Sequence, residues 1–99
     1  MLTQTLVYVK GEVIGVGFRA WTKIQAKELG LNGWVRNVYN RPEVFGTGGG
    51  VEACIQGEQT KVEEMLLRLQ SGSPISRVDD VEVIWQEPKE IYEGFEIRK

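Results

Sequence analysis

The sequence predicts an α+β protein, a two-layer sandwich in which two helices cover one face of an antiparallel sheet. Two observations carry this prediction. Strand-like and helix-like segments follow one another in the order β-α-β-β-α-β with a short last strand, and both helical segments have one apolar face. This is the arrangement of the split βαβ, ferredoxin-like sandwich. The 99 residues are enough for one core, so we expect a single domain over residues 1–99.

The first half of the chain contains two predicted strands and the first helix. Residues 5–10 are β-branched and apolar, which predicts a strand, and a glycine-rich stretch over 11–17 follows. We expect a helix over 18–29 that ends at Gly30. The residues of its core-facing stripe recur at helical spacing: Phe18, Trp21, Thr22, Ile24, Ala26 and Leu29. A turn at Asn32-Gly33 leads into the second strand, residues 34–39.

The second half contains the remaining strands and the second helix. Residues 51–56 alternate in polarity and predict the third strand. The second helix begins with a capping box of Thr60 and Glu63 and ends before residues 71–74, Ser-Gly-Ser-Pro. Its apolar face consists of Val62, Met65, Leu66 and Leu69. A fourth strand over about 77–85 and a short last strand follow, and their apolar residues are Val81, Val83, Trp85, Phe95 and Ile97.

The composition excludes several kinds of chemistry. The chain has no histidine, which removes Ser-His and Cys-His nucleophile pairs and zinc sites of the HExxH type. It has one cysteine, Cys54, so no internal disulfide can form, which favours a reducing compartment. The net charge is −2 and no basic cluster is visible, which argues against nucleic acid as a partner. No apolar run is long enough to span a membrane.

The stretch from Gly11 to Arg19 joins the first strand to the start of the first helix. Glycines allow consecutive backbone N–H groups to face one anion, and the start of a helix adds unpaired N–H groups. Arg19 in the first helical turn would add a planar fork of donors for two phosphate oxygens. On these residues alone, a tight turn with Arg19 in solvent is an equal alternative. The stretch Gly15–Ala20 also fits the G-x-G-x-x-A dinucleotide pattern, which we discount because no acidic residue follows about 20 positions later.

Several segments resemble one known family. Residues 9–19, Val-Lys-Gly-Glu-Val-Ile-Gly-Val-Gly-Phe-Arg, resemble the first signature of the acylphosphatases, and residues 33–37, Gly-Trp-Val-Arg-Asn, resemble the second. Residues 49–57 are similar to the continuation of that second signature. Residues 72–79 and the closing Gly94-Phe95-Glu96-Ile97 fit the later segments of the family. The resemblance covers nearly the whole chain in order.

The resemblance implies a small cytosolic enzyme that hydrolyses acyl phosphates without a metal or a cofactor. From their places in the two signatures, Arg19 would be the catalytic arginine and Asn37 the catalytic asparagine. The loop Gly11–Phe18 would bind the substrate phosphate through its backbone, at Ile14, Gly15, Val16, Gly17 and Phe18. The implied partners are a small acyl phosphate and inorganic phosphate, with no nucleic acid and no membrane, and we expect a monomer.

This reaction can proceed without histidine. The leaving group is a carboxylate whose conjugate acid has a pKa of about 4, so it departs without being protonated. Phosphoryl transfer depends mainly on positioning and on charge stabilisation. Arg19 and the backbone N–H groups would stabilise the phosphate oxygens, and Asn37 would hold one water in line. Transfer of the water's proton to a phosphate oxygen is a hypothesis.

The chain departs from the family pattern in two places. Ile14 stands where the family usually has glutamine, which a loop that binds through backbone N–H groups should tolerate. Residues 40–48 replace a short Asp-Gly turn and make this connection roughly eight residues longer, beyond a common hairpin loop. We expect a mobile, solvent-exposed loop, because lengthening a loop costs little stability. The alternative is an arm that folds over a neighbouring surface or a second subunit and buries Phe45.

Other functions and other roles for single residues stay open at this level. The protein could be a non-catalytic ferredoxin-like module that binds an anion or a partner, or a domain of a larger carbamoyl-transfer protein. Asn37 could be an ordinary strand residue, although asparagine is uncommon in strands. We expect Arg36 and Arg41 to be solvated at the surface and Cys54 to be buried. The tryptophans, expected in or near the core, are Trp21, Trp34 and Trp85.

Overall fold

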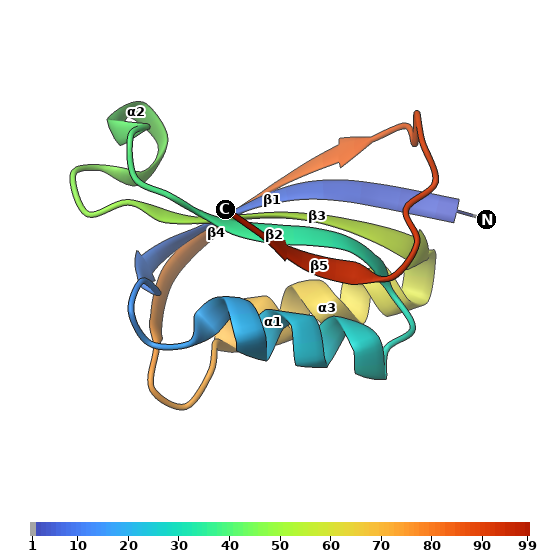
Figure 1. Cartoon of the computed structure of the whole chain (residues 1–99), viewed down its shortest axis with the longest axis horizontal. Coiled ribbons are helices and arrows are strands. Elements are labelled where there is room, and N and C mark those ends of the chain that lie inside the picture. The colour runs from blue at the N-terminus through green and yellow to red at the C-terminus, as the bar shows by residue number, and fades with distance from the viewer. Residues whose placement is uncertain (1) are drawn as a thin grey trace.

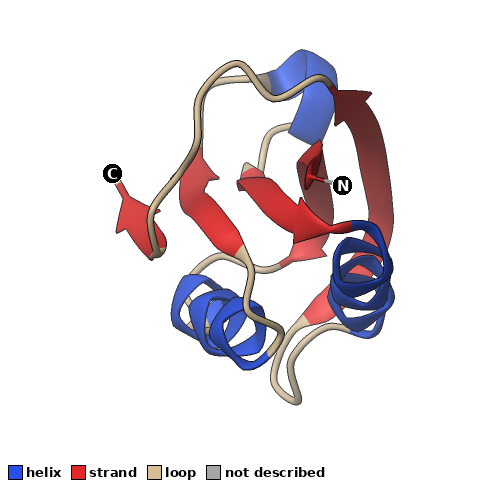
Figure 2. Ribbon diagram, turned by 90° about the vertical axis from the view of Figure 1, so that its right-hand side faces the viewer, coloured by secondary structure: helices blue, strands red, loops and turns tan. Residues whose placement is uncertain are grey.

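A computed structural model describes residues 2–99 as one five-stranded sheet with two long helices on one face (Figures 1 and 2). The helices are α1 (Phe18–Glu28) and α3 (Gln59–Ser71). The strands are β1 (Leu2–Glu12), β2 (Asn32–Val38), β3 (Gly50–Glu58), β4 (Arg77–Gln86) and β5 (Phe95–Arg98). Their spatial order is β4-β1-β3-β2-β5. The predicted ferredoxin-like sandwich with a short last strand is therefore confirmed.

Strand pairing places the start of α1 beside the end of β2. Strand β1 pairs antiparallel with both β3 and β4, and β2 pairs antiparallel with β3. Strand β5 is parallel to β2, with Gly33 opposite Phe95.

The core lies between the sheet and the two long helices, where fully buried side chains include Val7, Phe18, Val35, Ile55, Val62, Met65 and Leu69. None of the helices described in residues 2–99 could cross a membrane, since each is too short or too polar.

Three details of the sequence prediction are wrong. Helix α3 begins at Gln59 after Glu58, without a side-chain cap, and the Thr60 hydroxyl donates to the Glu58 carboxylate instead of closing a capping box. Ile24 is 56% exposed, because the buried face of α1 is the narrower stripe Phe18, Thr22 and Ala26. Trp85 is 50% exposed, because β4 is an edge strand with a neighbour on one side only.

The segment between β2 and β3 is folded back onto the sheet. It contains a short helix, α2 (Pro42–Phe45), which lies on the opposite side of the sheet from α1 and α3 (Figure 1). The Phe45 ring packs edge to face on Tyr8 with 5.6 Å between the ring centres, and Gly50 leaves the space that Phe45 occupies. Arg41 donates from Nη1 to the Tyr8 hydroxyl at 3.3 Å. The expected solvent-exposed loop is therefore only partly right: Phe45 and Arg41 contact Tyr8 on the open face, whereas residues 40, 42, 43 and 46–48 are exposed.

Candidate active site

The loop between β1 and α1 has a backbone suited to an anion. Gly15 and Gly17 have φ angles of 80° and 72°, whereas no residue other than glycine has a positive φ in residues 2–99. The sign of φ therefore alternates from Ile14 to Gly17, which is the pattern of a backbone nest whose N–H groups converge. A Cβ on either glycine would meet nothing within 4 Å, so the conformation and not tight packing requires glycine at these positions.

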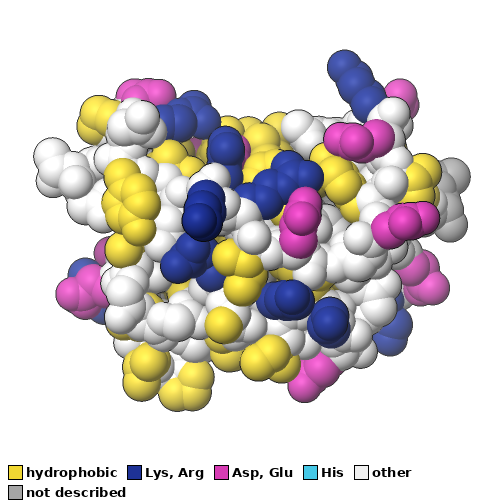
Figure 3. All heavy atoms as spheres, in the orientation of Figure 1, with side chains coloured by type: hydrophobic (Ala, Val, Ile, Leu, Met, Phe, Trp, Pro, Cys, Tyr) yellow, Lys and Arg dark blue, Asp and Glu magenta, His cyan; other side chains and the backbone are white. Residues whose placement is uncertain are grey.

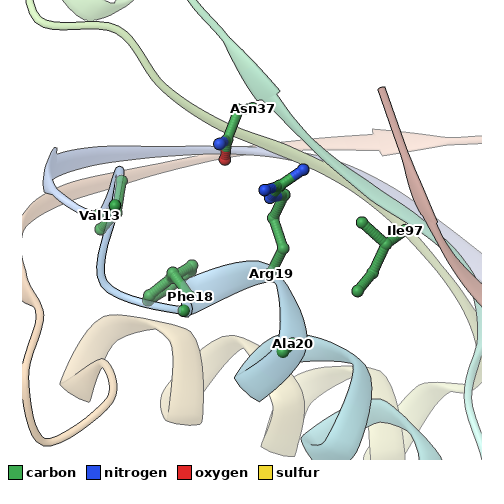
Figure 4. Close-up of a pocket in the computed structure, with 8 residues that line it drawn as sticks. Val13, Phe18, Arg19, Ala20, Asn37 and Ile97 are labelled. Carbon is green, nitrogen blue, oxygen red and sulfur yellow. The ribbon is translucent and has the colours of Figure 1, made fainter.

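A pocket of about 190 Å³ opens beside this loop (Figure 4). The loop and the first turn of α1 form one wall, while Asn37 of β2 and Ile97 of β5 complete it. Ile14 and Val16 do not line this pocket but a separate groove with Glu12 and Ile75. The side chains of Ile14 and Val16 are thus directed away from the pocket beside Arg19. These two residues can contact a ligand in that pocket only through their backbone atoms. This arrangement accommodates Ile14 at the position where the family usually has glutamine.

Arg19 is half-buried in the pocket wall and has no carboxylate partner in residues 2–99. The chain has six arginines. The others each pair with at least one carboxylate: Arg36, Arg41, Arg68, Arg77 and Arg98. A guanidinium without a carboxylate keeps its donors available for an incoming anion. Arg19 is therefore the arginine whose charge a ligand could satisfy.

Asn37 faces Arg19 across the pocket (Figure 4). It pairs with Val51 in the sheet and so belongs to the face of β2 that carries Val35 into the core. Asn37 follows the core residues on this face of β2, and here the pocket separates β2 from the start of α1. Its Nδ2 donates to the Tyr39 hydroxyl at 3.0 Å, whereas its Oδ1 is enclosed and has no hydrogen-bond partner. An enclosed acceptor without a partner is unfavourable until a ligand or a water satisfies it.

Other enclosed polar atoms without a partner do not belong to this pocket. They are Thr5 Oγ1, Trp34 Nε1 and Ser73 Oγ, and none of these residues lines the pocket. Among residues 2–99, Asn37 is therefore the one residue with such an atom that lines the pocket. The lining also contains no carboxylate and no thiol.

Arg36 lies next to Asn37 in sequence but points to the other face of the sheet. It is ion-paired to Glu52, with 2.6 Å between Arg36 Nη2 and Glu52 Oε1, and the Glu52 carboxylate is almost fully buried. Arg36 is still at the surface as expected, with 43% of its side chain exposed, and it also neutralises the buried Glu52 carboxylate. Arg41 is likewise at the surface, with 40% of its side chain exposed, and it contacts Glu43 and Tyr8.

The aromatic and thiol groups outside the pocket are structural. Trp34 is buried, and the guanidinium groups of Arg36 and Arg98 lie over its ring at 5.3 and 4.8 Å. Trp21 is half-buried against Phe18. Cys54 is buried as expected, and this burial raises the pKa of its thiol, which opposes formation of a nucleophilic thiolate. Residues 2–99 contain no group of three or more Cys, Asp and Glu side chains placed to hold a metal ion.

The face that contains the pocket is basic although the chain is acidic overall. Figure 3 shows Lys and Arg side chains gathered over the centre of this face, with Asp and Glu side chains mostly toward its rim. Lys23 and Lys27 follow Arg19 on α1 at intervals of one helical turn. A concentration of one sign of charge around a pocket attracts ligands of the opposite sign. The surroundings of the pocket therefore favour small anions.

Sequence reasoning found Arg19, Asn37 and the loop but missed two residues. Ile97 closes the pocket from the edge strand, and its place depends on the parallel pairing of β5 with β2. Tyr39 holds the Asn37 amide. The period of two along a strand puts residues 37 and 39 on the same face, so this spacing could have indicated the contact.

The fold and the pocket together define a class of small ferredoxin-like proteins. In this class a glycine loop, an arginine without a carboxylate partner among residues 2–99 and an asparagine line one pocket. The acylphosphatase family model matches residues 5–97. The chain belongs to the acylphosphatase family.

Individual relatives agree with this assignment. An acylphosphatase of Rhizorhabdus wittichii is 52% identical over 77 residues, which cover 78% of this chain and 70% of that protein. An acylphosphatase of Haloarcula marismortui is 40% identical over 96 residues, which cover 97% of this chain and 96% of that protein. The crystal structure of acylphosphatase from Bacillus subtilis superimposes over the whole of both chains, with a TM-score of 0.86 at 31% identity.

Proposed function

We propose that this acylphosphatase hydrolyses the carboxyl–phosphate bond of small acyl phosphates with Arg19, Asn37 and the backbone of residues 14–18. One observation carries the assignment of roles. The free Arg19 guanidinium and the unpartnered Asn37 oxygen face one pocket beside the loop whose N–H groups converge. The loop and Arg19 would take the phosphate oxygens, and Asn37 would take the water.

The reaction can be written with these groups alone. The water oxygen forms a bond to phosphorus while the bond between phosphorus and the acyl oxygen breaks, and the carboxylate leaves with the electron pair. The water's proton passes to an oxygen of the phosphate. Arg19 and the N–H groups stabilise the charge on the equatorial oxygens, and Asn37 Oδ1 accepts a hydrogen bond from the water and orients it.

This mechanism suits an anhydride better than a stable ester. The carboxylate leaves without a general acid, since the pKa of its conjugate acid is about 4. An alkoxide leaving group would need a proton donor, and the pocket lining offers no carboxyl, thiol or imidazole group. We therefore propose acyl phosphates as the substrate class and the carboxylate and inorganic phosphate as the products.

A direct assay tests the proposal. Purified protein with EDTA should release phosphate from acetyl phosphate, and it should leave p-nitrophenyl phosphate, a monoester, essentially intact. Inorganic phosphate should inhibit competitively as a product that occupies the same loop. Binding of phosphate without turnover of any acyl phosphate would instead identify a non-catalytic anion-binding module.

Three further parts of the proposal concern the protein as a whole. We propose that residues 1–99 form one domain, which is supported by the single sheet that all five strands share. We propose a monomer that acts on small molecules, without nucleic acid or membrane as a partner, in line with the net charge of −2. We propose a cytoplasmic location, supported by the free, buried Cys54. Gel filtration with light scattering tests the oligomeric state.

A further inference from the structure

Tyr39 is an exposed aromatic residue that makes one specific contact at the pocket. Its side chain is 65% exposed, so packing does not explain an aromatic residue at this position. Its hydroxyl oxygen accepts the hydrogen bond from Asn37 Nδ2 at 3.0 Å. Tyr39 itself does not line the pocket that contains Arg19. Its hydroxyl therefore reaches this site through Asn37.

The Tyr39 contact restrains the Asn37 amide, whose two ends differ in what they offer the pocket. An amide has a donor end and an acceptor end of nearly equal shape, so sterics alone do not distinguish its two orientations. The Tyr39 hydroxyl takes the donor end, and the acceptor end, Oδ1, then remains without a protein partner. A water that is to be oriented by Asn37 needs the acceptor end. The Tyr39 hydroxyl can donate or accept, and in this structure it accepts from Nδ2, so the bond restrains the amide with Oδ1 as its unpartnered end.

The lengthened connection holds Tyr39 in place. Tyr39 directly follows β2, and Gly49 directly precedes β3. Gly49 has a φ of 75°, and a Cβ there would come within 2.6 Å of the Val38 carbonyl oxygen and 3.6 Å of Tyr39 Cδ1. The backbone at Gly49 thus lies against the Tyr39 ring. The two ends of the long connection close on each other at the residue that contacts Asn37.

We propose that Tyr39 is a positioning residue for hydrolysis, which orients the Asn37 amide so that Oδ1 faces the attacking water. This inference rests on the proposed role of Asn37 in the reaction. Tyr39 does not line the pocket that contains Arg19, so its effect on the reaction would pass through Asn37. Its contribution is to hold in one orientation an amide that would otherwise turn about its side-chain bonds.

A double-mutant cycle with acetyl phosphate tests this inference. Tyr39→Phe removes only the hydroxyl, and we expect kcat to fall about fivefold with KM nearly unchanged, which corresponds to the loss of one hydrogen bond. In the Asn37→Ala background the same change should lower kcat by less than about twofold, since the group through which Tyr39 acts is absent. The matched control is Tyr8→Phe, which removes a hydroxyl that contacts Arg41 on the opposite face.

The Asn37 side-chain amide gives a second readout that does not depend on turnover. Its two N–H resonances in a ¹⁵N-labelled sample should shift in Tyr39→Phe and stay in place in Tyr8→Phe. If Tyr39→Phe lowers kcat equally in both backgrounds, or leaves kcat and the resonances unchanged, the inference is wrong. If the wild-type protein binds phosphate but hydrolyses no acyl phosphate, the proposed function has failed instead, and the amide resonances still show whether Tyr39 holds Asn37.

Discussion

The loop from Val13 to Gly17 and the connection from Tyr39 to Gly49 differ in what their glycines and arginines contact. Gly15 and Gly17 have open space where a Cβ would be, and nearby Arg19 has no carboxylate partner in residues 2–99. In the longer connection, Gly46 and Gly48 are equally open, but Gly49 at its end is packed against the Val38 carbonyl oxygen and Gly50, which follows it, against Phe45 and the Val9 carbonyl oxygen. Arg41 there contacts both Glu43 and Tyr8.

The first segment is therefore suited to binding a ligand, whereas the second is stabilised by contacts within the protein. The first leaves its donors unsatisfied, which costs stability and is useful only when an anion arrives. The second satisfies its groups internally, as a connection folded onto the sheet should. The glycines alone do not distinguish the two, since Gly46 and Gly48 of the connection are as open as those of the loop, whereas the partners of Arg19 and Arg41 do.

Substituting the arginine of each region, Arg19 or Arg41, tests the comparison between the two regions most strongly. Arg19→Ala should lower kcat/KM for acetyl phosphate about 10³-fold and weaken phosphate inhibition, because the main cation at the phosphate is lost. Arg19→Lys should also be poor, since an ammonium cannot replace a planar fork. Arg41→Ala, the control from the other region, should retain turnover. Steady-state kinetics of the three variants measures kcat/KM and phosphate inhibition. Near-normal phosphate inhibition in Arg19→Ala would contradict the assignment.

Asn37 should affect the rate more than binding. We expect Asn37→Ala to lower kcat about 10²-fold with little change in KM, because water placement matters in the transition state and not in substrate binding. Measurement of kcat and KM with acetyl phosphate separates the two effects. A large rise in KM with kcat intact would make Asn37 a substrate-binding residue instead.

Substituting one glycine in each region should give opposite results. Gly50→Ala places a methyl group against the Phe45 ring and should cost about 1–3 kcal/mol of stability, with turnover largely retained. Gly15→Ala meets no neighbouring atom, but its φ of 80° should cost about 1–2 kcal/mol and disturb the N–H groups that bind phosphate. Urea unfolding and phosphate titration measure both. Equal loss of phosphate affinity in the two variants would remove the distinction between the regions.

Blocking the thiol should have the smallest effect. An ordinary cysteine has a pKa of about 8.5, and burial raises the pKa of the Cys54 thiol. The Cys54 thiol therefore stays protonated up to higher pH and reacts slowly with alkylating reagents. Native protein treated with iodoacetamide at pH 8 should keep its activity and react at Cys54 only after urea is added. Mass spectrometry follows the modification. Rapid native labelling with loss of turnover would show that the thiol is accessible.

The fold could be predicted from the sequence because the signals that indicate it lie in residues close together along the chain. Apolar periodicity located both long helices and the order of strands, and the two signature motifs located Arg19 and Asn37. The missed features depend on distant contacts. Phe45 folds back because it meets Tyr8, and Ile97 reaches the pocket because β5 joins the edge of the sheet. Trp85 is exposed because β4 has no outer neighbour, and the position of a strand in a sheet is not encoded in its own residues.

The interior place of β1 in the sheet also determines when the pocket can form during folding. Arg19 and Asn37 are joined through the sheet by pairings such as Val9 with Val51, and β1 pairs on its other side with the distant β4. Chains dominated by such non-local pairings close large loops before they gain contacts, and they typically fold in milliseconds to seconds. The ability to bind phosphate should therefore appear in the last, sheet-forming phase of refolding, and a partly folded chain should be inactive rather than weakly active.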